Sequence, residues 1–313
     1  MSDMAPLFSL FAIIPVILGG FYFYAHQRTF GNLDITTSSV AYDRARYHDL
    51  LDWDKYALTI EGEPTQIHSG EFHYWRVPDR ERWSPILKQY RAAGFNTIRI
   101  YFHWGYHSPA EGVYNFEGNR DIEYLLNLCE ELNLFVLAAP GPYICAETQG
   151  GGYPGWLVAK RDLNIRHNFI MLWRVYDQKF ADYEIQWLNH ILPIIARHQI
   201  TENKADKKGC VLGLQIDNEL FETMANLLPI GLHDQMRVLA KAARDVGITV
   251  PLFSNDGFEE GGWVPRPELD GQKKKKFWNK ERFGLDLYGF DKYVSKYGLN
   301  FGYNIFSHMI YIF

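Results

Sequence analysis

The part of the chain best suited to chemistry is an amide followed by a carboxyl group, Asn218-Glu219, just after the apolar run from Val211 to Ile216. An apolar run that ends in polar residues is typical of a buried parallel strand whose carboxyl end opens into a cleft. A carboxyl group there can protonate a glycosidic oxygen, and the amide beside it can bind a sugar hydroxyl. Alone, the pair is weak evidence, because many ordinary strands end in polar residues.

Polar and aromatic loops follow other strand-like segments in the same way. They are Gly70-Glu71-Phe72-His73-Tyr74, Thr97-Ile98-Arg99-Ile100-Tyr101, Gly141-Pro142-Tyr143-Ile144-Cys145-Ala146-Glu147 and Gly151-Gly152-Tyr153-Pro154-Gly155-Trp156. Together and in this order, these motifs resemble the catalytic domain of glycoside hydrolase family 35, the retaining β-galactosidases. The resemblance runs from about Tyr56 to about Tyr293.

The resemblance implies roles for four residues. Glu219 would be the catalytic acid/base, and Asn218 would bind the 2-hydroxyl group of the sugar. Tyr101 would lie in the galactose pocket, and Glu147 would bind the outer hydroxyls. The implied substrate is a β-galactoside oligosaccharide or glycoconjugate, and no cofactor is implied. A different sugar specificity stays open, because these motifs do not resolve the contacts to the 2- and 4-positions.

One residue departs from the family pattern, which usually has Glu where Asp217 stands. On a strand, Asp217 would point to the same face as Glu219, two residues later. A like charge at that position would raise the pKa of Glu219 and help it to stay protonated.

The elements that position these residues alternate between strand-like and helix-like segments, which predicts a parallel sheet. We expect strands over residues 67–72, 97–101, 135–139, 211–216, 250–254 and 283–287, and helices over residues 83–93, 121–133, 176–198 and 233–246. The fold class is therefore α/β, of the (β/α)8 TIM-barrel type, with about six of the eight βα units present. Glu219 would follow the fourth strand, where relatives of this fold carry the acid/base.

A retaining glycosidase also needs a nucleophilic carboxylate about 5 Å from the acid/base, and relatives of this fold carry it after strand seven. The later glutamates all precede or flank the expected fifth and sixth strands, namely Glu222, Glu259, Glu260, Glu268 and Glu281. Residues 294–313 form an atypical tail without any carboxylate. We therefore expect a truncated family member within residues 55–293 that lacks its nucleophile. The alternative is a non-catalytic galactoside-binding or remnant protein.

The N-terminus predicts the destination of the protein. Residues 4–25 carry no charge, and Leu7 to Tyr24 is long enough to cross a bilayer as a helix. Residues 1–27 are thus expected to be a signal anchor or a signal peptide, followed by a polar linker over residues 28–54. This predicts the secretory pathway, with the protein membrane-anchored, or secreted or lysosome-like if the segment is cleaved.

Composition excludes some other classes of protein. The 313 residues are 47% hydrophobic, which allows a sizeable core, while a net charge of −5 and a pI near 6.1 give no attraction to nucleic acid. No zinc-like spacing links the cysteines and the clustered histidines, so we expect no metal site. These residues are Cys129, Cys145, Cys210, His68, His73, His103 and His107.

Overall fold

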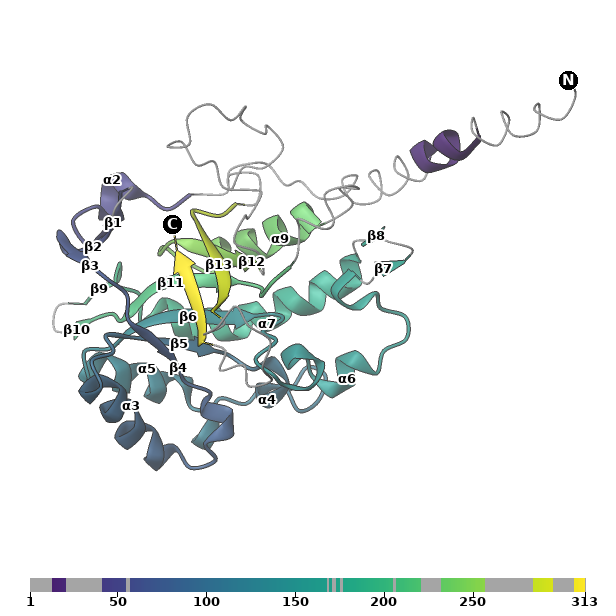
Figure 1. The fold of residues 1–313 in the computed structure, drawn as a ribbon. Coiled ribbons are helices and arrows are strands. Elements are labelled where there is room, and N and C mark those ends of the chain that lie inside the picture. Colours follow the sequence, from purple (N-terminus) through teal and green to yellow (C-terminus); the bar gives the residue numbers. More distant parts are fainter. Residues whose placement is uncertain are drawn as a thin grey trace, which may run out of the picture.

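The computed structural model describes residues 13–20, 41–54, 57–167, 169–170, 173–174, 177–204, 207–220, 232–256, 284–294 and 307–312 (Figure 1). Its centre is a seven-stranded sheet in the order β14-β13-β12-β11-β6-β5-β4. Six neighbouring strands run parallel: β4 (Ser69–Glu71), β5 (Thr97–Tyr101), β6 (Phe135–Gly141), β11 (Val211–Ile216), β12 (Leu252–Asp256) and β13 (Leu287–Val294). The predicted incomplete (β/α)8 fold is confirmed.

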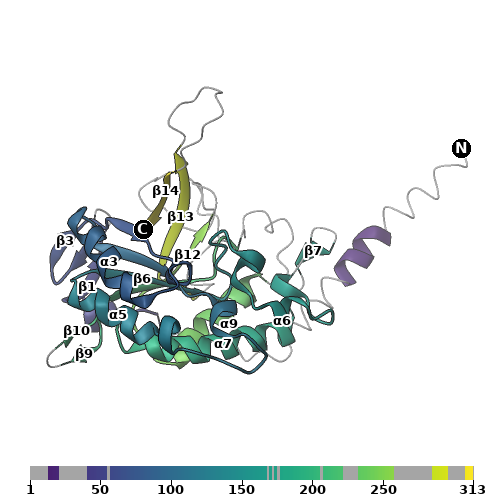
Figure 2. The ribbon, with the colours of Figure 1, turned by 90° about the horizontal axis from the view of Figure 1, so that it is seen from below.

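Four long helices accompany these strands: α3 (Trp83–Ala92), α5 (Ile122–Glu131), α7 (Gln178–Ala196) and α9 (Leu232–Asp245). Three lie inside their predicted ranges, and α9 begins one residue before its range. The helices pack side by side in chain order, as the outer helices of a barrel do. Figure 2 shows α5, α7 and α9 along one side of the sheet. Asp121 and Asp177 cap α5 and α7 by accepting from backbone amides, which stabilises each helix by about 1 kcal/mol.

Shorter helices and strands lie in the segment before the central sheet and in the loops between its strands. They are α2 (Arg44–Tyr47), β1 (Leu51–Trp53), β2 (Leu58–Ile60), β3 (Glu63–Thr65), α4 (Trp104–His107), α6 (Gly155–Val158), β7 (Phe169–Ile170), β8 (Trp173–Arg174), β9 (Asn203–Lys204) and β10 (Lys207–Lys208). Single 3-10 turns lie at Tyr74–Arg76, Arg80–Arg82, Gly118–Arg120, Gln149–Gly152 and Ile165–His167.

Strand β5 shows how the sheet sorts its side chains. Ile98 and Ile100 are fully buried in the main apolar core, and Arg99 and Tyr101 alternate with them, so they must face the opposite side of the sheet. Truncating either isoleucine to alanine would cost about 2–5 kcal/mol. The apolar core therefore fixes the direction in which the two polar side chains of this strand point.

The predicted linker over residues 28–54 differs from the structure in its last part. Residues 41–54 hold α2 and β1, and Tyr42, Tyr47 and Leu51 are buried in the core. The backbone N–H of Tyr42 donates to the carboxylate of Asp286 at 2.8 Å. Aromatic side chains among the polar residues of this segment are the reason that it packs onto the domain.

The sixth strand, predicted over residues 283–287, begins only at Leu287 in the structure. Pairing of β13 with β12 starts at Leu287, because the carboxylate of Asp286 accepts from the backbone N–H of Leu252 and binds Arg244, both at short range. The preceding residues 284–286 form a turn and a bend. Strand β14 (Ser307–Ile312), within the tail of atypical sequence, pairs antiparallel with β13. The outer edge of the sixth strand is therefore covered by β14.

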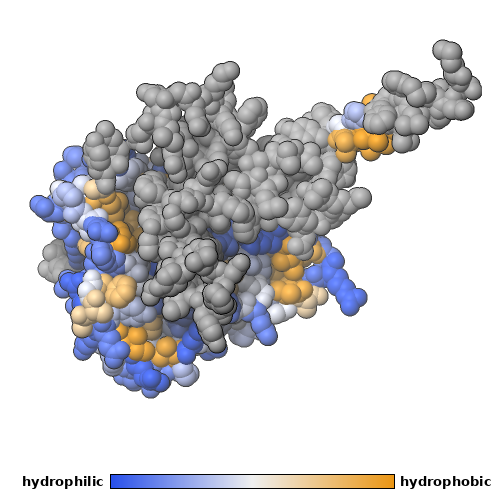
Figure 3. Space-filling view, in the orientation of Figure 1, coloured by the Kyte–Doolittle hydropathy of each residue, from blue (hydrophilic) through white to orange (hydrophobic). Residues whose placement is uncertain are grey.

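Of the apolar N-terminal segment, the structure describes residues 13–20, which are helical; the rest of the predicted anchor lies outside the described residues. The helix does not pack on the domain, since Val16 is 74% exposed and Ile17 63%. Its apolar surface is visible in Figure 3. Within the described part of the chain, no helix has the length and apolar character needed to span a membrane.

Candidate active site

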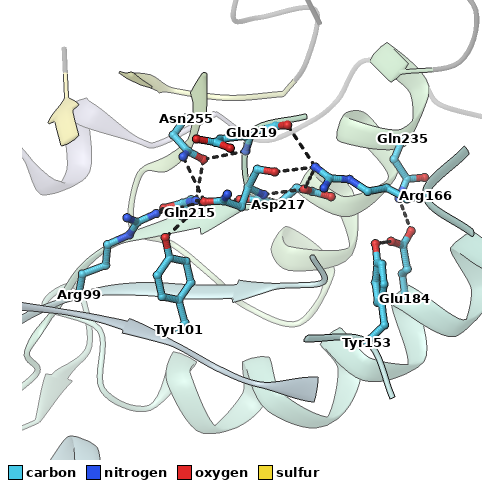
Figure 4. A network of polar contacts seen from close by, with 11 residues as sticks. Arg99, Tyr101, Tyr153, Arg166, Glu184, Gln215, Asp217, Glu219, Gln235 and Asn255 are labelled. Atoms are coloured by element: carbon cyan, nitrogen blue, oxygen red, sulfur yellow. Dashed lines mark hydrogen bonds and ion pairs between the residues drawn. The ribbon is translucent and has the colours of Figure 1, made fainter. Parts of the chain in front are cut away.

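A layer of polar side chains crosses the sheet on the face opposite the apolar core. Arg99 on β5 is 3% exposed and lies between two partners, the carboxylate of Glu71 at 2.8 Å and the amide oxygen of Gln215 at 2.5 Å. The amide nitrogen of Gln215 donates to Asn255 on β12 at 2.8 Å. Four strands thus contribute to one hydrogen-bonded chain, drawn from Arg99 to Asn255 in Figure 4.

The hydrogen bonds from Arg99 to Asn255 fix the orientation of Asn218. Arg99 can only donate, so it sets Gln215 with its oxygen toward the guanidinium. The backbone N–H of Glu219 can only donate as well, which sets the oxygen of Asn255 toward it at 3.2 Å. The amide nitrogens of Gln215 and Asn255 then both point at the Oδ1 atom of Asn218, at 3.2 and 3.1 Å.

Tyr101 completes the set of donors around Asn218. Its hydroxyl donates to Oδ1 of Asn218 at 3.3 Å, and a guanidinium nitrogen of Arg99 lies 3.4 Å from the same oxygen. Since the oxygen faces inward, the Nδ2 amide must face the other way. The side-chain hydrogen bonds of Asn218 within the described part of the chain all use Oδ1. Asn218 therefore presents a donor to whatever occupies the site.

The turn that carries Glu219 is left-handed at two non-glycine positions. The φ angles are +56° at Asp217 and +44° at Glu219, a conformation that costs about 1–2 kcal/mol per residue. Arg166 holds this turn: its Nη2 atom lies 3.1 Å from Asp217 Oδ1, 2.6 Å from the carbonyl of Asn218 and 3.2 Å from that of Glu219.

The expectation for Asp217 assumed that the strand continues to Glu219, and the structure does not have such a strand. Strand β11 ends at Ile216, and the alternation of a strand does not extend through two left-handed residues. Asp217 is buried and paired with Arg166, so a cation compensates its charge. Asp217 is thus a structural member of the turn, held by Arg166.

Glu147 lies on a second left-handed turn, after β6. Cys145, Ala146 and Glu147 have φ angles of +54°, +47° and +44°. Arg76 donates to the carbonyls of Ala146 at 2.6 Å and Glu147 at 3.2 Å. The side chain of Glu147 is exposed and is not part of the hydrogen-bonded group around Asn218. The structure thus brings Tyr101, Asn218 and Glu219 together and places Glu147 at the same edge of the sheet, after the neighbouring strand.

A second carboxyl lies behind the Asp217 turn. Glu184 on α7 accepts from the hydroxyl of Tyr153 at 3.3 Å and, at very short range, from the amide of Gln235. Burial raises the pKa of Glu184 well above its usual 4.5, and the negative charge of Asp217 raises it further. Figure 4 places this group beside Arg166, at the opposite end of the network from Arg99. Burial and the charge of Asp217 thus both favour the protonated form of Glu184.

Sequence reasoning missed Arg99, Gln215, Asn255 and Arg166. A signal for the first two was present, because Arg99 is the one charged residue of its strand and Gln215 the one polar residue of an otherwise apolar strand. Such a residue must find a partner when it is buried. Asn255 follows the apolar part of β12 in the way that Asn218 follows β11. Arg166 carried no signal, since it lies in a loop and acts through backbone carbonyls.

The histidines near the first two strands have local partners. His107 Nε2 lies 2.6 Å from the hydroxyl of Tyr74, and its Nδ1 lies 2.8 Å from the carbonyl of Asn115. Burial lowers the pKa of His107 to about 3 and that of His103 to about 4. Both are neutral core histidines at physiological pH. Of the residues that the structure describes, no group of three or more His, Cys, Asp or Glu side chains could hold a metal ion.

Polar side chains gathered at the carboxyl ends of parallel barrel strands mark the face on which barrel enzymes carry their active sites. The chain belongs to the glycosyl hydrolases family 35, whose sequence profile matches residues 57–260.

Two curated relatives of the chain are fungal proteins. The probable beta-galactosidase B of Sclerotinia sclerotiorum is 32% identical over 260 residues, which cover 80% of this chain and 23% of that protein. The probable beta-galactosidase C of Aspergillus clavatus is 36% identical over 249 residues, covering 78% and 22%. The chain thus spans about a quarter of the length of these relatives.

Among solved structures, a cold-adapted beta-galactosidase from Rahnella sp. R3 aligns with 72% of this chain and 39% of its own, with a TM-score of 0.48 and 15% identity. That likeness is too distant to bear on function.

Proposed function

We propose that this chain carries the acid/base half of a site that removes terminal non-reducing β-D-galactose residues with retention of configuration. Glu219 would protonate the glycosidic oxygen as it leaves and later take a proton from the attacking water. Tyr101 and Glu147 would bind hydroxyl groups of the galactose ring. The substrate would be a β-galactoside oligosaccharide or glycoconjugate.

One observation carries this proposal, the fixed orientation of Asn218. Its Oδ1 accepts from Tyr101 and from the amides of Gln215 and Asn255. Its Nδ2 is left to donate to a substrate hydroxyl, next in sequence to the acid/base. A hydrogen bond from a preset donor to the 2-hydroxyl strengthens as charge develops on the sugar ring, so it lowers the barrier without reorganisation.

We also propose that none of the glutamates in this chain serves as the nucleophile. Two carboxylates of the site are already engaged, Glu71 by Arg99 and Asp217 by Arg166, and burial raises the pKa of Glu184, which disfavours its ionised form. The five glutamates after Glu219 lie outside the described residues. A nucleophile of the retaining route must be ionised and free to reach the anomeric carbon.

The test measures binding and turnover separately. The 313-residue chain should bind methyl β-D-galactoside in saturation-transfer NMR, and bind the α-anomer less well, while releasing no nitrophenol from nitrophenyl β-D-galactoside. Joining the chain to the later strands of a relative's catalytic domain should restore release, and Glu219→Gln should remove most of it. Robust turnover by the unextended chain would show that one of its own glutamates is the nucleophile.

For localisation, we propose the secretory pathway, with the protein anchored or released through its N-terminal apolar segment. The support is the uncharged sequence from residue 4 to residue 25. Cell fractionation, with and without residues 1–27, tests this. A full chain recovered entirely in the cytosolic fraction would contradict it.

A further inference from the structure

Two arginines hold the two turns that present the glutamates of the site. One nitrogen of Arg166 lies 2.6 and 3.2 Å from the carbonyls of Asn218 and Glu219, and one nitrogen of Arg76 lies 2.6 and 3.2 Å from those of Ala146 and Glu147. In each pair the second carbonyl belongs to the glutamate itself. The same arrangement thus recurs after two neighbouring strands.

These contacts stabilise an unfavourable backbone conformation. Left-handed residues with a Cβ atom are disfavoured, and turns of this kind bring successive carbonyl dipoles close together. A guanidinium that donates to both carbonyls offsets their repulsion, and a charged donor forms the stronger kind of hydrogen bond. Without such a donor, each turn would relax toward ordinary backbone angles and the glutamate would point elsewhere.

We propose that Arg166 and Arg76 are positioning residues, each of which aims one glutamate of the galactoside site by holding the backbone of its turn. The proposal rests on the function proposed above for Glu219 and Glu147. Neither arginine is assigned a contact with the sugar. Each acts through the carbonyl oxygens of the residues that do make contact.

The two arginines are built into the fold to different depths. Arg166 pairs with the buried carboxylate of Asp217, and its guanidinium lies 3.5 Å from the centre of the Tyr143 ring. Tyr143 belongs to the loop after β6, so Arg166 ties that loop to the turn after β11. Arg76 is exposed. Loss of Arg166 should therefore loosen its turn more than loss of Arg76 loosens the other.

The experiment uses the full chain and treats each arginine as the control for the other. We would make Arg166→Gln, Arg166→Lys, Arg76→Gln and Arg76→Lys, and follow backbone amide exchange. The amides of Asp217 and Glu219 are informative, because they donate to the carbonyl of Gly141 at 2.8 Å and to Asn255 at 3.2 Å. A second readout is the pH titration of the glutamate carboxyl carbons by NMR.

Arg166→Gln should speed exchange across residues 217–219 at least tenfold and move the titration of Glu219. Its effect on residues 145–148 should be much smaller, because Arg166 reaches that loop only through the ring of Tyr143. Arg76→Gln should affect residues 145–148 and leave Glu219 unchanged. The lysine variants should fall between, since an ammonium group keeps the positive charge but lacks the planar fork of arginine. A general loosening of the structure would speed amide exchange in both turns to the same extent.

Unchanged exchange at residues 217–219 in a folded Arg166→Gln protein would overturn the proposal. If that variant does not fold, Tyr143→Leu removes the ring beneath the guanidinium and should give a smaller effect at the same amides; no effect there would overturn it equally. Binding of methyl β-D-galactoside separates the two ideas. If the unmutated chain binds no galactoside but Arg166→Gln frees the turn, the proposed function fails and the positioning role stands.

Discussion

The hydroxyl of Tyr101 lies 3.3 Å from the Oδ1 atom of Asn218, although 117 positions separate the two residues in the chain. The contact joins the end of β5 to the turn after β11. Tyr101 is also held from the side, because the guanidinium of Arg99 lies 4.3 Å from the centre of its ring. The ring is therefore positioned before any ligand arrives.

Replacing Tyr101 by Phe tests the value of that contact. Tyr101→Phe should weaken methyl β-D-galactoside binding severalfold, because Asn218 loses a donor and the pocket loses a hydroxyl. The free energy of unfolding should fall by only about 1 kcal/mol, since one neutral hydrogen bond is lost. NMR titration and urea denaturation measure the two effects. Unchanged affinity would remove Tyr101 from the binding site.

The buried carboxyl of Glu184 predicts a pH dependence of stability. Its pKa is raised in the folded protein, so the native state holds a proton that the unfolded chain releases above about pH 4.5. The unfolded state therefore binds fewer protons, and stability falls as pH rises from that point toward the folded pKa. Glu184→Gln mimics the neutral acid and should be progressively more stable than the unmutated protein above pH 5.

Denaturant unfolding from pH 4 to pH 8 measures this difference, and the exposed Glu117→Gln serves as the control variant. A constant difference between Glu184→Gln and the unmutated chain across that range would show that Glu184 titrates normally.

Gly151 should tolerate no side chain. Its φ angle is +61°, and a Cβ atom placed there would lie 1.8 Å from the Tyr143 ring, which packs against Arg166. Gly151→Ala should cost about 2–4 kcal/mol of stability through overpacking and backbone strain. Gly155→Ala is the matched control, since nothing lies within 4 Å of that position. Equal melting temperatures for the two variants would refute the close packing.

A buried cluster around His198, on the helix side of the sheet, should matter for stability alone. Its ring nitrogens lie 2.6 Å from Glu130 and 3.0 Å from Glu123, and both the ring and Glu130 are buried. His198→Asn should destabilise the protein by about 3 kcal/mol, because a buried carboxylate loses its partner. Arg197→Ala removes an exposed partner of Glu123 and should cost less than about 1 kcal/mol. Urea denaturation compares them, and similar losses would contradict this account.

The sequence predicted the parts of the fold that depend on local pattern. A short apolar run such as Val211 to Ile216 is typical of a strand that is buried on both faces of the sheet. The four helices were predicted from the helical spacing of their apolar residues. The sixth strand was misplaced because the carboxylate of Asp286 accepts hydrogen bonds from backbone N–H groups that are distant in sequence. A local sequence pattern does not show such contacts. The same holds for the site. Motifs indicated Tyr101 and Asn218, whereas the role of Asp217 depended on backbone angles that only the folded turn reveals.

The antiparallel pairing of β14 with β13 has a consequence for how the barrel could be completed. Backbone groups on the outer edge of β13, from Gly289 to Val294, are already bonded to residues 307–312. A parallel strand placed seventh in the sheet would need those same groups. The two arrangements are therefore mutually exclusive, and closing the barrel would first require β14 to be displaced from β13.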